Sequence, residues 1–241
     1  MKKLALLSVF TLIALPCLTT LAHASCPVQN CLFYGGDLDL NDPNQNGLAN
    51  ENDAIVGGNP YGAATYQSFH TIQEVWIYSA FSNNLSTITP DSGYWEIRSG
   101  VSEGNGGTLV ASGTNTITHT PTGRSDFGYT EYTDNIGVGS VHLVQAGWWW
   151  LTAVPICTTC AGRSFNSNAN TRLNGVGDTN PGEQFFNSAF FGANFTNANN
   201  EGVFNVFSSG VSGTTVPEPS SMIMLGSGLL AAAGVVRRRL L

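Results

Sequence analysis

The chain is 241 residues long, contains 28 glycines and carries a formal net charge of −7, with only 10% of its residues charged. Between residues 25 and 219 there is no lysine, and four arginines stand against all 16 acidic residues, which gives this region a formal charge of −12. Such a surface repels polyanions, so DNA or RNA binding is excluded and anionic lipid is an unfavourable partner.

The chain begins with a predicted secretory signal peptide. Two lysines precede an apolar stretch over residues 4–18, and Ala22 and Ala24 supply the small side chains that cleavage requires. Residues 1–24 are therefore expected to be removed after export through the inner membrane.

Residues 25–60 form an acidic segment rich in Asn and Gly. Oxygen-bearing side chains recur here with the spacing of a calcium-binding loop, and Gly47 falls at the sharp turn. The ligand positions hold Asp42, Asn44, Asn46 and Asp53. The last ligand is an Asp where a longer, bidentate Glu is usual. Two interpretations stay open: a calcium ion held by this loop together with Asp37 and Asp39, and a loop whose side chains bond to their own backbone.

Residues 61–213 carry the pattern of an all-β domain. Their abundance of Gly, Asn, Ser, Thr and aromatic residues disfavours long helices, and turn clusters separate short runs of strand formers. No helical period lies between these runs, which argues against an α/β fold. We predict a single jelly-roll-like antiparallel β-sandwich. Strands are expected at residues 72–81, 94–98, 108–111, 115–120, 127–132, 138–144, 148–156, 185–195 and 202–207.

Two of these strands allow a more detailed prediction. Residues 72–81 are apolar on both faces, which is typical of a central, buried strand. The strand at residues 94–98 alternates, which predicts that Trp95 and Ile97 point into the core and that Glu96 and Arg98 point outward.

Three consecutive tryptophans, Trp148, Trp149 and Trp150, fall within one predicted strand, so that Trp149 faces opposite to its neighbours. One face of this strand must belong to the core. If the other face is open, its indoles form a flat apolar platform for stacking on sugar rings, which would make the domain a carbohydrate-binding module. The alternative is that sheet or loop covers both faces.

Four cysteines remain after removal of the signal peptide: Cys26, Cys31, Cys157 and Cys160. An even number of cysteines in an exported protein implies disulfides, and four cysteines allow three connectivities. We favour the two local pairs, Cys26 with Cys31 and Cys157 with Cys160. A redox-active role for the second pair is disfavoured because a loop-like stretch, rather than a helix, follows it.

Threonines recur at every second position from residue 114 to residue 122 and place a ladder of hydroxyl and methyl groups on one strand face. A threonine array can order water. An ice-binding surface needs the ladder repeated over many strands, however, and the chain shows no internal repeat. A solvated strand edge is the favoured interpretation.

The sequence contains no nucleophile elbow, zinc-protease motif, phosphate loop or dinucleotide fingerprint. His70, His119 and His142 are too scattered to indicate a metal site. The candidate acids for a glycoside hydrolase are Glu74, Glu96, Glu131 and Glu183. Their spacing gives no evidence that any two lie at the separation a glycosidase needs. We therefore expect a protein that acts by interaction rather than by chemistry, with a secreted glycan hydrolase as the less favoured alternative.

The C-terminal residues 214–241 have three parts: a proline-bounded motif, an apolar segment and an arginine cluster. The motif and cluster consist of Val216, Pro217, Glu218, Pro219, Arg237, Arg238 and Arg239. The prolines exclude a helix before residue 220, and residues 220–236 are just long enough to cross the membrane, with the arginines on the cytoplasmic side. This order resembles the PEP-CTERM sorting tail of Gram-negative bacteria. The resemblance implies transient anchoring in the inner membrane, cleavage by an exosortase, and a final place at the cell surface or in the medium.

The body also resembles a group of small PEP-CTERM proteins with one β-sandwich between signal peptide and tail. The shared features are Trp and Ile residues at 76–78 and 95–98, a Gly-Gly turn before residues 108–111, and the strand entry at 143–151. The resemblance implies a jelly-roll body in an exported protein associated with the cell envelope or exopolysaccharide, and it carries no catalytic residues.

Overall fold

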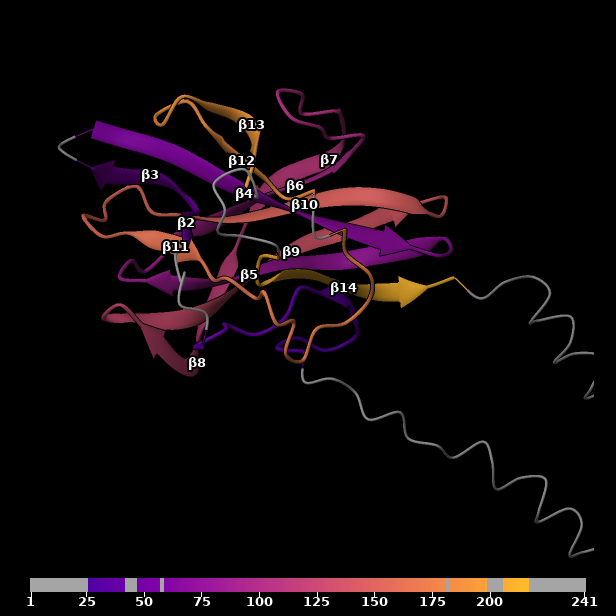
Figure 1. The fold of residues 1–241 in the computed structure, drawn as a ribbon, viewed down its shortest axis with the longest axis horizontal. Coiled ribbons are helices and arrows are strands. Elements are labelled where there is room, and N and C mark those ends of the chain that lie inside the picture. Colours follow the sequence, from indigo (N-terminus) through magenta and orange to yellow (C-terminus); the bar gives the residue numbers. More distant parts are fainter. Residues whose placement is uncertain (1–25, 42–46, 57–58, 181–182, 199–205, 217–241) are drawn as a thin grey trace, which may run out of the picture.

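The computed structural model describes residues 26–41, 47–56, 59–180, 183–198 and 206–216. Within these ranges the chain forms strands and turns and no helix, and its strands build two sheets (Figure 1). The all-β prediction is therefore confirmed. The predicted signal helix and membrane helix lie outside the described residues.

The first sheet is organised around β5, which is central as predicted. One edge of β5 pairs along its length with β9, which in turn pairs with β8, and the other edge pairs with β14 and then with β11. β1 extends this sheet from β14, and β2 extends it from β11. Its strands are β1 (Cys31–Tyr34), β2 (Leu48–Ala49), β5 (Val75–Ser86), β8 (Ile117–Asp126), β9 (Tyr129–Leu143), β11 (Ser164–Asn166) and β14 (Ser209–Thr215).

The second sheet has the order β13-β12-β4-β3-β10-β6-β7, with a further pairing between β4 and β10. Its pairings are antiparallel apart from one parallel bridge between β10 and β3. Its strands are β3 (Glu51–Val56), β4 (Asn59–Thr71), β6 (Ser92–Ser99), β7 (Thr108–Asn115), β10 (Gly147–Ile156), β12 (Phe185–Ser188) and β13 (Ala193–Asn197). The acidic segment at 25–60 thus contributes strands to both sheets.

The apolar core lies between the two sheets and is built from alternate residues of the central strands. The main core cluster includes Ile77 and Ile136 from the first sheet and Trp95, Ile97 and Leu151 from the second. The inward direction predicted for Trp95 and Ile97 is therefore confirmed.

Part of the space between the sheets is polar. The amide of Asn50 donates to the carbonyl oxygen of Ala153 at 2.9 Å and to Oδ1 of Asn84 at 3.0 Å. Asn84 in turn donates to Asp134, whose other oxygen lies 2.6 Å from Nδ1 of His119. Buried polar groups are tolerated only when hydrogen bonds replace lost water, and this network supplies those bonds while linking the two sheets at that end.

Several predicted strand boundaries are wrong, each for a local reason. Ile72 lies outside β5 and is 78% exposed, because the chain crosses between the sheets there. The predicted strands at 127–132 and 138–144 are one strand, β9; a bulge near Gly139, with φ +77°, interrupts its alternation. The predicted strand at 185–195 is two strands, β12 and β13, joined by a turn that ends at Gly192 (φ +68°).

Glu96 points away from the core between the sheets, as predicted, but it is not solvated there, since it is only 6% exposed. The outer face of the second sheet is covered at this point by β12 and β13, whose Phe185 and Phe195 pack in one apolar cluster with Tyr66 and Trp150. The carboxylate of Glu96 accepts hydrogen bonds from the hydroxyls of Tyr66 and Tyr94 and from the guanidinium of Arg98. A second, smaller core beneath the covering strands buries this charge.

The Glu96 cluster predicts a pH dependence of stability. Burial raises the pKa of Glu96, but the hydrogen bonds from Arg98, Tyr94 and Tyr66 outweigh it and hold the pKa below the ordinary 4.5. A carboxyl with a depressed folded-state pKa stabilises the fold fully above its unfolded pKa, and this contribution is lost as the pH falls through the folded value. Urea unfolding between pH 7 and pH 2 should therefore show a shallower acid loss of stability for Glu96→Gln than for the parent. Equal slopes would contradict this assignment.

Candidate functional site

The sorting residues predicted from sequence follow β14 in the chain. Val216 is the only one of them within the described residues, and its backbone is fixed to the β4–β5 connection. Its N–H donates to the carbonyl oxygen of Glu74 at 3.0 Å, and its carbonyl oxygen accepts from the amide of Gln73 at 3.0 Å. Pro217, Glu218, Pro219, Arg237, Arg238 and Arg239 lie outside the described residues. The described part of the body therefore reaches the first residue of the predicted motif.

The structure separates the three tryptophans. Trp149 belongs to the core between the sheets, where its indole N–H donates to Oγ1 of Thr71 at 3.0 Å. Trp150 lies in the second core and donates to the carbonyl oxygen of Glu183 at 2.9 Å. Only Trp148 is exposed, by 40%, with its ring 4.8 Å from that of His70. The predicted platform is thus reduced to a single indole.

The two local disulfide pairs are confirmed by proximity. Cys26 lies beside Cys31, with Cα atoms 6.2 Å apart, and Cys157 lies beside Cys160 at 5.5 Å. The first pair closes the turn that precedes β1. The second closes the turn after β10.

Asp42, Asn44 and Asn46 of the predicted calcium loop, and the side chain of Asp53, lie outside what the structure describes. Asp37, which we considered as an additional ligand, has other partners. Its carboxylate accepts from Tyr34, Asn174 and Arg124 at 2.7, 2.8 and 3.0 Å. Nowhere in the described ranges do three or more His, Cys, Asp or Glu side chains gather as a metal site.

The candidate catalytic acids and histidines are dispersed through the fold, each with its own partner. Glu74 pairs with His142, and Glu131 pairs with Arg124. His119 pairs with Asp134. Glu96 lines a pocket of about 200 Å³ together with Tyr66 and Tyr94, and none of the other three glutamates lines it.

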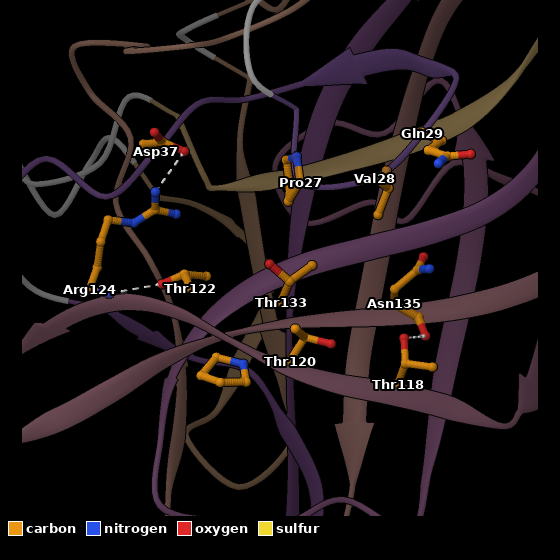
Figure 2. Close-up of a pocket in the computed structure, with 11 residues that line it drawn as sticks. Pro27, Val28, Gln29, Asp37, Thr118, Thr120, Thr122, Arg124, Thr133 and Asn135 are labelled. Atoms are coloured by element: carbon orange, nitrogen blue, oxygen red, sulfur yellow. Dashed lines mark hydrogen bonds and ion pairs between the residues drawn. The ribbon is translucent and has the colours of Figure 1, made fainter.

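A pocket lies on the outer face of the first sheet, between the N-terminal segment and the β8–β9 hairpin (Figure 2). Its volume is about 490 Å³. We call it the threonine pocket, because three members of the threonine ladder line it together with a threonine of β9. The lining residues are Pro27, Val28, Gln29, Asp37, Thr118, Thr120, Pro121, Thr122, Arg124, Thr133 and Asn135.

The local structure explains why these side chains gather. β8 pairs with β9 alone within the described part of the sheet, so Thr118, Thr120 and Thr122 lie on an edge strand. The predicted single ladder is divided, because Thr114 belongs to β7 of the second sheet and Thr116 lies in the connection between β7 and β8. Thr118 and Thr120 lie opposite Asn135 and Thr133 of β9. Figure 2 shows Pro27, Val28 and Gln29 of the N-terminal segment across from these strands. The pocket is thus walled by a strand pair on one side and by the chain around the first disulfide on the other.

Arg124 closes one end of the threonine pocket. Its guanidinium pairs with the fully buried carboxylate of Glu131 and, at 3.0 Å, with Asp37 of the N-terminal segment. Burial lowers the pKa of Arg124, but the neighbouring carboxylates, chiefly that of Glu131, raise it above its ordinary value. Arg124 therefore stays protonated, and two carboxylates neutralise its charge. The pocket offers mainly uncharged hydrogen-bonding groups to an occupant.

One pocket residue has an unsatisfied acceptor. Thr118 donates to the backbone carbonyl of Asn135, but the side-chain Oδ1 of Asn135 is shielded and finds no hydrogen-bond partner among the described residues. Buried polar atoms normally have a partner in the protein, in water or in a ligand. Sequence reasoning missed both Asn135 and Arg124 as pocket residues. The scarcity of arginine in so acidic a body was the one signal that marked Arg124.

Residues 215–239 match the family model of the PEP-CTERM protein-sorting motif. No curated protein and no solved structure matches the chain. Among the residues that the structure describes, no helix is long and apolar enough to span a bilayer, and the predicted membrane segment at 220–236 falls outside them.

The motif indicates an exported protein that carries a membrane-anchored C-terminal sorting signal and is processed by an exosortase. The β-rich body is consistent with that class of protein. The match is confined to the tail, so the role of the body must be argued from its own residues.

Proposed function

We propose that the body of this exported, exosortase-processed protein binds a neutral polysaccharide of the extracellular matrix through the threonine pocket, and acts there by interaction rather than by catalysis. The observation that supports this most directly is the chemistry of the pocket wall. Hydroxyls of Thr118, Thr120 and Thr133 and amides of Gln29 and Asn135 surround a pocket of about 490 Å³. These groups both donate and accept hydrogen bonds, as sugar hydroxyls do.

The shape and charge of the pocket favour the same class of ligand. The rings of Pro27 and Pro121 and the side chain of Val28 supply apolar surface beside the polar groups, which suits a pyranose ring with its apolar faces and polar rim. Arg124 is neutralised by Asp37 and Glu131. Because the body is formally −12, a neutral polysaccharide is favoured over one rich in uronic acids.

Titration calorimetry of the exported protein against the neutral fraction of its host's exopolysaccharide, with a uronate-rich polymer as comparison, tests the proposal. Thr118→Val with Thr120→Val should weaken neutral-glycan binding about five- to thirtyfold, at about 0.5–1 kcal/mol per lost hydrogen bond. The matched control is Thr114→Val with Thr116→Val, which removes two hydroxyls of the predicted ladder that do not line the pocket. This control should bind like the parent.

Trp148→Ala tests the alternative that the glycan stacks on an exposed indole, because Trp148 is the one exposed indole of the predicted platform. If this variant loses binding while the pocket variant behaves like the parent, the glycan stacks on the indole and the pocket assignment is wrong. If the parent binds neither polymer, the body has a structural role at the surface without a glycan ligand.

A further inference from the structure

The end of the sandwich from which the tail departs consists of three neighbouring chain segments. The β4–β5 and β9–β10 connections lie side by side, because Thr71 pairs with Gly147 and Val75 pairs with Leu143. Val216 is hydrogen-bonded to the first of these connections. Figure 1 shows β4, β9 and β14 ending, and β5 and β10 beginning, at this same end, on the right of the view.

Large apolar side chains project into solvent at this end. Ile72, in the first connection, is 78% exposed, and Val144, in the second, is 67% exposed. Trp148, one residue into β10, presents part of its indole beside His70. We call Ile72, Val144 and Trp148 the apolar tip. Single exposed apolar residues are ordinary, but three on adjoining segments at one end of a strongly acidic domain need an explanation.

The tip is nearly free of charge although the body is acidic. Over residues 70–76, 142–148 and 213–216, the only Asp, Glu, Lys or Arg is Glu74. One further acidic residue lies close by, because the carbonyl oxygen of Asp178 accepts from the N–H of His70. Glu74 pairs with His142, whose ring stacks on Trp76 at 4.0 Å. The repulsion that keeps the body from anionic surfaces is therefore reduced at the tip.

The tail holds this end close to the bilayer. From Val216 to Ser220, where the predicted membrane segment begins, is four residues, which span at most about 14 Å. The polar layer on each side of the hydrocarbon is roughly 5–8 Å thick. While the tail is intact, the end that carries the tip therefore lies at the membrane surface.

We propose that the apolar tip inserts into the interfacial layer of the periplasmic leaflet while the tail anchors the protein. The proposal rests on the export and anchoring that the sorting motif indicates. Indole and aliphatic side chains are the groups that partition into this layer, and neutral lipid headgroups meet no opposing charge at the tip. A docked tip fixes the orientation of the body and holds the Pro217–Pro219 motif at the membrane surface, where a membrane protease cuts.

The test uses the tail-bearing protein in vesicles of phosphatidylcholine and phosphatidylethanolamine, with plain or brominated acyl chains, and records tryptophan emission. Because Trp148 is one of five tryptophans, bromine should remove up to about a fifth of the parent emission. Trp148→Phe should abolish this quenching, and Ile72→Ser with Val144→Ser should reduce it. The matched control is Phe127→Ser, which replaces a residue that is 61% exposed in the β8–β9 turn, outside the tip. It should be quenched like the parent.

Flotation of the same vesicles distinguishes anchoring by the tail from insertion of the apolar tip. Protein that floats and is quenched as expected supports the tip proposal. Protein that floats without tip-dependent quenching overturns the tip proposal and leaves the anchor in place. Protein that does not float contradicts the anchoring itself. If quenching is absent but Ile72→Ser with Val144→Ser slows processing in cells, the tip docks on the protease rather than on lipid, and the lipid proposal is overturned.

Discussion

Replacing both Pro217 and Pro219 with alanine is expected to leave the full-length precursor in the inner membrane and to abolish its release. Each proline fixes its own φ and keeps the preceding residue out of the α region, so the segment between the body and the membrane helix stays extended. Alanine is the strongest helix former, and the double substitution would let the predicted helix at 220–236 grow towards Val216. A protease that reads an extended peptide would then lose its substrate.

Membrane fractionation followed by immunoblotting measures the outcome, with the precursor and the released body separated by size. Pro90→Ala is the matched control, because it removes a proline from a loop of the body and leaves the tail unchanged. This control should be released normally. Normal release of the Pro217→Ala, Pro219→Ala variant would contradict the exosortase assignment that residues 215–239 support.

The sequence was most informative where local pattern alone decides structure. Alternation located the core residues of the strand around Trp95 and the opposite directions of Trp149 and Trp150, because a strand has a fixed period of two. Proximity in the chain was enough for the two disulfides. The pattern failed at Gly139, where a bulge in β9 breaks the period within a single long strand.

The sequence was least informative about contacts between distant segments. Glu96 reads as an outward residue on an alternating strand, and only the packing of β12 and β13 over that face buries it. The sequence suggested Asp37 as an additional calcium ligand, yet in the structure Asp37 pairs with Arg124 of β8, far along the chain. The threonine ladder was visible as a periodic feature, but the chain segment that turns it into a pocket wall was not.

Substituting Arg124 with methionine should lower the free energy of unfolding by about 3–5 kcal/mol, because it strands the fully buried carboxylate of Glu131 without a counter-charge. Methionine keeps much of the length and the apolar stem, so lost packing contributes little. The same change releases Asp37 and with it a link between the N-terminal segment and the hairpin. Urea denaturation of the exported body, followed by tryptophan fluorescence, measures the loss.

The double variant Arg124→Met, Glu131→Gln separates a stranded charge from a general loss of structure. A neutral amide at residue 131 needs no counter-charge and can still accept from Thr122, which donates to Glu131 at 2.7 Å, so the double variant should recover much of the stability. Arg172→Met is the matched control, because its guanidinium donates to the backbone carbonyls of Gly35 and Gly177 rather than to a buried carboxylate. It should cost about 1 kcal/mol. If Arg124→Met costs no more than this control, the Arg124 ion pairs do not hold the wall of the pocket, and the threonine pocket must be maintained by the β8–β9 pairing alone.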